Sequence, residues 1–203
     1  MKLIGMLDSP YVRRVAISLR RLGIAFEHEP LSVFSTFERF RQINPVVKAP
    51  TLVCDGGESL MDSTLILDYL EALAETGRSL MPSALPDRLR ALRVIGLALA
   101  AAEKTVQIVY EQNLRPVEKQ HAPWLERVNG QLLAAYAELE AELVRRPLQG
   151  GETIGQDGIT VAVVWSFTRM MLGDVVDARA YPALDAFASE AERLAIFLET
   201  PAR

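Results

Sequence analysis

A proline at position 50 separates a polar loop from an apolar run, and this junction strongly constrains the fold. Pro50 has no amide hydrogen and cannot donate to a sheet ladder, so it belongs at the start of a strand or on an edge strand. The preceding bond, between Ala49 and Pro50, is of the only kind that adopts the cis form at low cost. A cis bond here would expose the backbone N–H and C=O of Ala49 to whatever lies beside the loop.

Further along, the pair Asp62-Ser63 precedes a segment with helical spacing of apolar residues. The N-terminus of a helix leaves backbone N–H groups unpaired, and such groups bind carboxylates. One small ligand with a peptide backbone and a carboxylate could therefore contact both the Pro50 loop and Ser63. Taken singly, the two features are also consistent with an edge-strand proline and an ordinary serine cap.

The first part of the chain alternates strand and helix signals. Ser9 is a good N-cap, Pro10 suits the first helical position, and Gly23 ends the apolar periodicity. Since a β-helix-β order with so long a crossover implies parallel strands, we expect a βαβ unit first. The expected strands are 2–7, 24–29, 51–54 and 58–61, and the expected helices are 10–22, a short one within 31–43, and one from 63 onward. This order is typical of a thioredoxin-like domain.

After residue 77 the strand signal disappears. Residues 78–87 contain two prolines among small residues and are predicted to be a linker. Beyond it, apolar residues at helical spacing predict only helices. We therefore expect a thioredoxin-like domain over 1–77 and an all-helical domain over 88–203. The expected long helices cover 89–109, 124–143 and 159–171, and a last one begins at 182.

These features together resemble the glutathione S-transferase superfamily. Its members have a loop Asn-Pro-x-x-Lys-x-Pro before a strand and a Glu/Asp-Ser pair at the next helix, as in Asn44–Pro50 and Asp62-Ser63 here. The α/β-then-helical order extends the resemblance over essentially the whole chain. Residues 158–162 also resemble the family's Gly-x-Ile-Thr-x-Ala-Asp box, in which Thr and Asp cap each other. Val163 replaces that Asp, so we expect Thr160 alone to cap and Val163→Asp to stabilise by about 1 kcal/mol or less.

The segment Ser9-Pro10-Tyr11 resembles the active-site motif of the bacterial, serine-type branches. Related redox proteins begin and end this tetrapeptide with cysteine, whereas here it begins with Ser9 and ends with Val12, so classical dithiol redox activity is excluded. The resemblance implies instead that Ser9 donates a hydrogen bond to the sulfur of glutathione and favours its thiolate. Ser9 as a plain helix cap remains the alternative. Tyr11 could replace Ser9 as donor but is expected to form a wall of the site.

The resemblance also implies how glutathione is held. Lys48 would lie near the glycine carboxylate, unless it is merely a solvated loop lysine. Ala49 and Pro50 would bind the cysteinyl backbone, and Asp62 and Ser63 the γ-glutamyl end. A pocket for a second, hydrophobic substrate is expected between the domains, with walls from Tyr11, Phe34, Tyr110, Asn113 and Leu114, any of which could instead be core.

Two functions compete. The first is an enzyme that conjugates glutathione to a small hydrophobic electrophile, and the second is a non-catalytic member that binds glutathione, another ligand or a protein partner. The isomerase branch, with a Ser-Ser-Cys-type motif, matches Asp8-Ser9-Pro10 less well. A homodimer is expected, because the small domain has a marginal core and because the family dimerises. In addition, one long helix has apolar or small residues on several faces (Leu97, Ala98, Ala100, Ala101).

Composition excludes other classes. The net charge is −4, and neither half of the chain has an excess of basic over acidic side chains. This argues against nucleic acid and anionic membranes as partners. Two separated histidines make a metal site improbable on spacing alone. The single cysteine, Cys54, and the absence of a signal-peptide pattern or a membrane-spanning run predict a cytoplasmic protein.

Overall fold

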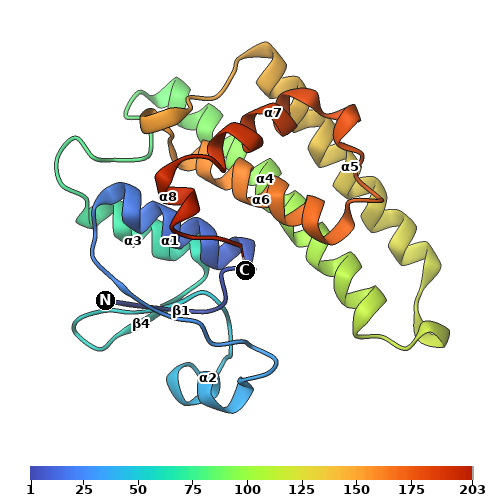
Figure 1. Cartoon of the computed structure of the whole chain (residues 1–203), viewed down its shortest axis with the longest axis horizontal. Helices are drawn as coiled ribbons and strands as arrows, with labels where there is room; N and C mark the ends of the chain where they lie inside the picture. The colour runs from blue at the N-terminus through green and yellow to red at the C-terminus, as the bar shows by residue number, and fades with distance from the viewer. Residues whose placement is uncertain (203) are drawn as a thin grey trace. The chain divides into compact units, whose positions relative to one another are not determined.

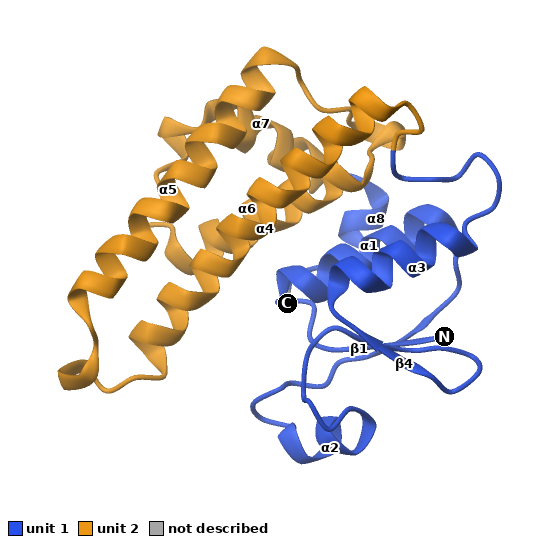
Figure 2. Ribbon diagram, turned by 180° about the vertical axis from the view of Figure 1, so that it is seen from behind, with its two compact units in different colours: residues 1–81, 193–203 blue, residues 82–192 orange. Residues whose placement is uncertain are grey.

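The computed structural model describes residues 1–202, which form two compact units (Figures 1 and 2). Unit 1 contains residues 1–81 together with the segment that begins at Arg193, and unit 2 contains residues 82–192. The predicted fold class, a thioredoxin-like domain followed by a helical one, is confirmed. The units differ from the predicted domains in two respects. The C-terminal segment was assigned to the helical domain but groups with unit 1, and the predicted linker 78–87 is shorter, because unit 2 starts at residue 82 and its first helix at Leu85.

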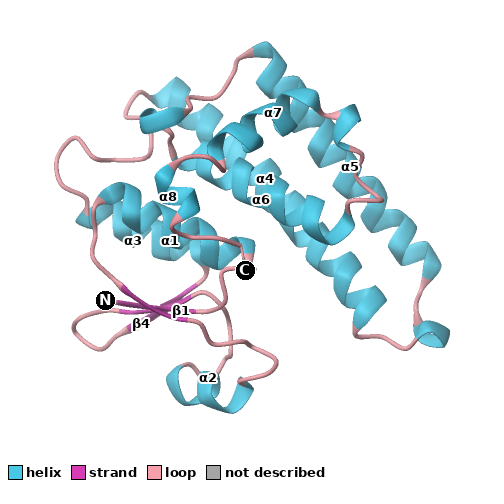
Figure 3. Ribbon diagram, viewed as in Figure 1, coloured by secondary structure: helices cyan, strands magenta, loops and turns pink. Residues whose placement is uncertain are grey.

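Unit 1 is built on a four-stranded sheet in the order β2-β1-β3-β4. Figure 3 colours the strands of this sheet magenta. Its strands are β1 (Lys2–Ile4), β2 (Glu27–Glu29), β3 (Thr51–Val53) and β4 (Ser59–Met61). β1 pairs with β2 in parallel and with β3 antiparallel, and β3 pairs with β4 antiparallel. The expected parallel βαβ unit and the expected antiparallel return are both present.

Helices cover both faces of this sheet. α1 (Pro10–Leu22), α3 (Ser63–Leu73) and the short α8 (Ala195–Leu198) lie on one face, and α2 (Phe37–Ile43) lies on the other (Figure 1). α1 begins with its proline and ends at Gly23, which adopts φ 73° as a left-handed C-cap. On the α2 side, Phe40 is fully buried against Ile4 and Leu31. The sheet is therefore a middle layer with an apolar core on each side.

Two arginines of α1 are buried, although they lie outside the apolar pattern of the helix. Arg13 and Arg14 are 3% and 1% exposed. The guanidinium of Arg13 donates from Nε to the backbone oxygen of Thr200 at 2.7 Å and lies 5.5 Å from the centre of the Phe197 ring. α8 and the residues after it thus cover a face of α1 that the local pattern predicts to be solvated.

Unit 2 consists of four long or medium helices joined by single turns of 3-10 helix. A carboxylate accepts hydrogen bonds at the start of two of them: Glu111 binds the N–H of His121 at 3.0 Å, and Glu140 binds the N–H groups of Ala183 and Leu184 at 2.8 and 2.9 Å. The elements are α4 (Leu85–Asn113), η1 (Val117–Lys119), α5 (Ala122–Arg145), η2 (Gly151–Thr153), α6 (Gln156–Leu172), η3 (Ala178–Ala180) and α7 (Pro182–Ala191). Among the described residues, no helix has the length and apolarity needed to cross a membrane.

The centre of unit 2 holds a buried chain of hydroxyl groups. The phenol of Tyr136 donates to Thr168 at 2.6 Å, and the hydroxyls of Thr168 and Thr105 are 2.8 Å apart. Burial raises the pKa of Tyr136, so its hydroxyl stays protonated and remains a donor. Because each buried hydroxyl has a partner, the network joins α4, α5 and α6 without leaving a polar group unpaired.

The predicted capping role of Thr160 is wrong. α6 begins at Gln156, so Thr160 lies one turn inside the helix, and its hydroxyl donates backward to the carbonyl of Gln156 at 2.7 Å. Val163 is 1% exposed and packs in the core of unit 2. The expectation that Val163→Asp would complete a cap and stabilise the protein is therefore reversed.

Val163→Asp should now lower the free energy of unfolding by about 3 kcal/mol or more, because it places an unpaired carboxylate in a dry core. Val163→Ala is the matched control, and the loss of two methyl groups should cost about 1–3 kcal/mol. Chemical denaturation of both variants measures the difference. An aspartate variant as stable as wild type would mean that the carboxylate reaches the backbone at the start of α6.

Candidate functional site

The register of the sheet brings three strand ends to one edge. Ile4, the last residue of β1, pairs with Thr51, and Thr51 pairs with Met61, the last residue of β4. Pro50, which precedes Thr51, and Asp62, which follows Met61, therefore flank the same end of an antiparallel pair. The segment after β1 leads from this same edge to the start of α1. The loop around Pro50, the start of α3 and the start of α1 thus converge.

The loop before β3 is held by its own side chains. Asn44 is 7% exposed; its amide donates to the Thr51 hydroxyl at 2.9 Å, and its carbonyl oxygen accepts from the N–H of Val46 at 3.0 Å. The Thr51 hydroxyl in turn donates to the carbonyl of Lys48 at 2.8 Å. The Ala49–Pro50 bond is cis, as the sequence allowed. The loop is therefore ordered from both ends.

Ala49 lies close to the segment that follows β1. Gly5 has φ +136°, and a Cβ added there would be 3.2 Å from the Ala49 Cβ and 2.6 Å from a methyl group of Val12. No side chain fits at position 5 without a shift of these neighbours. The absence of a side chain at Gly5 thus lets the loop approach the start of α1.

At the start of α3, Asp62 adopts φ 73° and caps the helix, since its Oδ1 accepts from the N–H of Thr64 at 2.9 Å. Ser63 is 4% exposed, and its Oγ accepts a hydrogen bond from Nη1 of Arg14 at 3.1 Å. Burial lowers the pKa of Arg14 from 12.5 to about 10, while the nearby Asp62 favours the charged form. Arg14 therefore stays a cation at neutral pH, beneath a helix N-terminus that already carries positive potential.

Lys48 lies on the same edge, with Nζ 3.9 Å from Oδ2 of Asp62. Both side chains are about half exposed, so this ion pair contributes little stability. The predicted contact of Lys48 with the glycine carboxylate of glutathione stays a prediction.

Ser9 occupies the N-cap position of α1, but its hydroxyl makes no capping hydrogen bond. Its backbone carbonyl accepts from the N–H of Arg13 at 2.9 Å, and its N–H donates to the carbonyl of Met6 at 3.2 Å. Ser9 is half-buried, as is Tyr11 on the first turn of the helix. These two backbone bonds hold the residue, and its hydroxyl is not used for capping. The alternative that the serine side chain caps α1 is not supported.

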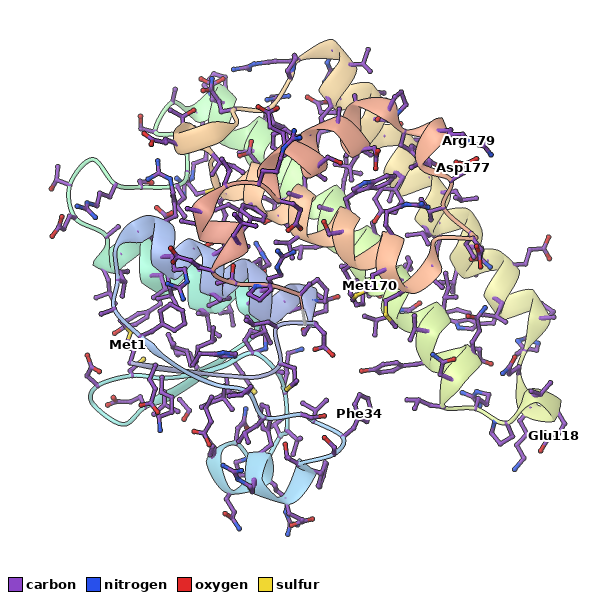
Figure 4. All side chains as sticks on the ribbon, in the orientation of Figure 1. Met1, Phe34, Glu118, Met170, Asp177 and Arg179 are labelled. Atoms are coloured by element: carbon purple, nitrogen blue, oxygen red, sulfur yellow. The ribbon has the colours of Figure 1, made fainter. Side chains whose placement is uncertain are left out.

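The predicted walls of the second-substrate pocket belong to different units. Tyr11 and Phe34 are in unit 1, and Phe34 projects from the loop before α2 with 58% of its surface exposed (Figure 4). The other three, Tyr110, Asn113 and Leu114, are exposed residues at the end of α4 in unit 2. The pocket that these residues would form together stays a prediction.

Sequence reasoning missed Arg14 and the bracing role of Asn44. Asn44 was noticed only as part of the loop motif, although its position before a β-strand and a cis proline is a signal for side-chain hydrogen bonds to the backbone. Arg14 gave no signal, because its burial depends on α3 and on the sheet. Within residues 1–202, no group of three or more His, Cys, Asp or Glu side chains is arranged to hold a metal ion.

Comparison with known proteins points to one family. Residues 3–78 match the family described as glutathione S-transferase, N-terminal domain. The uncharacterized GST-like protein YibF of Escherichia coli K12 is 31% identical over 180 residues, which cover 87% of this chain and 88% of that protein.

Two solved structures share the whole fold. A glutathione transferase family member from Pseudomonas fluorescens Pf-5, with bound S-(propanoic acid)-glutathione, is 29% identical with a TM-score of 0.82, and the match covers 98% of each chain. A glutathione S-transferase from Methylobacterium radiotolerans in complex with glutathione sulfonate is 26% identical with a TM-score of 0.89, and the match covers 98% of this chain and 93% of that one.

Proposed function

Because the chain belongs to the glutathione S-transferase superfamily, we propose that it binds glutathione at the edge of its sheet and transfers the thiolate to a small hydrophobic electrophile. The observation that carries this proposal is the convergence of the Ala49–Pro50 loop, the start of α3 and Ser9 on one edge of one unit. The bound glutathione derivatives of the two structural relatives support the choice of ligand.

In this arrangement each part of the tripeptide has a chemically suitable partner. The exposed backbone of Ala49 would pair with the cysteinyl residue, as an added strand pairs with a sheet edge. The α-carboxylate of the γ-glutamyl group would accept from the N–H and hydroxyl of Ser63, and its ammonium would lie near the carboxylate of Asp62. Lys48, on a solvated loop, would attract the glycine carboxylate.

Ser9 is the proposed thiol-activating residue. A hydroxyl that donates to sulfur stabilises the thiolate more than the thiol, and the N-terminus of α1 adds positive potential. The ordinary thiol pKa of about 8.5 would then fall toward neutral pH. The thiolate would form an S–C bond as a halide leaves with the bonding electrons, or would add to an activated double bond that then takes up a proton.

A non-catalytic binding protein is the second candidate. The same fold and the same tripeptide site would serve a protein that holds glutathione without turnover, since fold does not determine function. The Ser9 hydroxyl favours the enzyme, because it is not used to cap α1 and could donate to the thiol instead.

We also propose that the protein is a cytoplasmic homodimer. Ala98 and Ala101, which were expected on a dimer surface, are buried within unit 2. The exposed leucines of α4, namely Leu85, Leu89 and Leu92, form the apolar surface that a second copy would cover. Light scattering should give about twice the mass of one 22.5 kDa chain.

Isothermal calorimetry tests the ligand. Glutathione should bind with a dissociation constant between micromolar and millimolar, about −4 to −8 kcal/mol. Ser63→Ala should weaken binding about tenfold or more, because it removes a hydrogen bond to a charged group. Ser59→Ala, an exposed serine on the neighbouring β4, is the control and should bind like wild type. No heat at several millimolar glutathione would refute the proposed site.

Ser9→Ala separates enzyme from binding module. It should raise the pKa of bound glutathione, read from thiolate absorbance against pH, and slow conjugation about tenfold to a hundredfold. The free energy of unfolding should change by less than about 0.5 kcal/mol, because no capping bond is lost. A panel of electrophiles supplies the conjugation rates. If the variant titrates and turns over like wild type, Ser9 does not activate the thiol.

A further inference from the structure

Arg14 is a buried cation with incomplete hydrogen bonding. It is 1% exposed, and its Nη1 donates to the hydroxyls of Ser63 and Thr64 at 3.1 and 3.5 Å. Its Nε is buried and has no hydrogen-bond partner among the described residues. Both partners are neutral hydroxyl groups at the start of α3. The guanidinium of Arg14 therefore lies against the N-terminus of that helix.

Among the described residues, no carboxylate is hydrogen-bonded to Arg14. Asp62 attracts the guanidinium electrostatically, but its Oδ1 accepts the N–H of Thr64, and its Oδ2 lies 3.9 Å from the ammonium of Lys48. A buried charge whose hydrogen-bond partners are neutral is costly, and an anion close by offsets that cost. The place for such an anion is the start of α3, where free backbone N–H groups and Ser63 also favour one.

The contact with Arg14 also determines whether the Ser63 hydroxyl donates or accepts in each of its hydrogen bonds. A guanidinium has only donors, so Ser63 Oγ must be the acceptor in their bond. The hydroxyl hydrogen of Ser63 is then directed elsewhere and can be donated to a ligand. Arg14 thereby turns Ser63 into a donor toward the site, which suits a carboxylate and does not suit a cation.

We propose that Arg14 is a positioning residue that makes the start of α3 selective for the α-carboxylate of the ligand. This inference rests on the proposed binding of glutathione. It acts in two ways: the guanidinium orients the Ser63 hydroxyl as a donor, and its buried charge attracts the carboxylate without touching it. The alternative is that Arg14 only braces α1 against α3, in which case it has no preference for one ligand group over another.

The test compares two ligands in calorimetry: glutathione, and the analogue in which 4-aminobutanoyl replaces the γ-glutamyl group and so removes only the α-carboxylate. Wild type should prefer glutathione by about tenfold or more. Arg14→Gln should reduce that preference at least about fivefold by weakening glutathione binding, with little change for the analogue. Equal weakening of both ligands, or an unchanged preference, would overturn the inference, since a brace affects both alike.

Arg14→Lys provides the second arm. It keeps the charge and a donor, so the preference for glutathione should stay within about threefold of wild type. A Lys variant that loses the preference would overturn the inference, even if the Gln variant fails to fold.

Arg13→Gln is the matched control. Arg13 is the neighbouring buried arginine of α1 and binds Thr200 rather than α3. This variant should lower the unfolding temperature and leave the ligand preference unchanged, and a preference that changes as in Arg14→Gln would overturn a specific role for Arg14. Wild type that binds neither ligand would refute the proposed function itself, whereas glutathione binding with an unaltered preference in Arg14→Gln would refute the role of Arg14 alone.

Discussion

The hydrogen-bond register of β1, β3 and β4 decides where every proposed glutathione contact of the chain lies. Ile4 opposite Thr51 and Thr51 opposite Met61 align the ends of these strands. A slip of one residue would turn each side chain to the other face and separate the Ala49 loop from the start of α3. Strands of only three residues hold this register. The hydrogen bonds of Asn44 and Thr51 brace the entry to β3.

Much of this edge could be predicted from local sequence. Pro50 favours the start of a strand, Asp62 and Ser63 favour the start of a helix, and Pro10 and Gly23 mark the two ends of α1. Each of these residues has a backbone preference that does not depend on distant contacts. The structure places all of these features where they were expected. The roles of the residues toward a ligand are not a local property, and they rest on the family resemblance and on the proposals.

Other features depend on contacts that the local sequence does not show. Arg13 and Arg14 interrupt the apolar pattern of α1, yet segments remote in sequence cover them: α3 for Arg14, and the chain around Phe197 and Thr200 for Arg13. Thr160 was read as a cap because of its motif, although α6 begins a turn earlier. For the two arginines tertiary contacts override a local preference, and a single sequence carries no signal for those contacts.

The grouping of residues from Arg193 onward with unit 1 gives the chain a nested order: unit 2 is inserted, in sequence, between two parts of the other unit. During synthesis from the N-terminus, the helices of unit 2 leave the ribosome while α1 still lacks the segment that covers Arg13. The sheet-containing unit therefore begins first and is completed last. Until residue 200 emerges, Arg13 and its face of α1 are accessible to water and to other proteins. Co-translational binding partners would encounter this surface, which is buried in the finished protein.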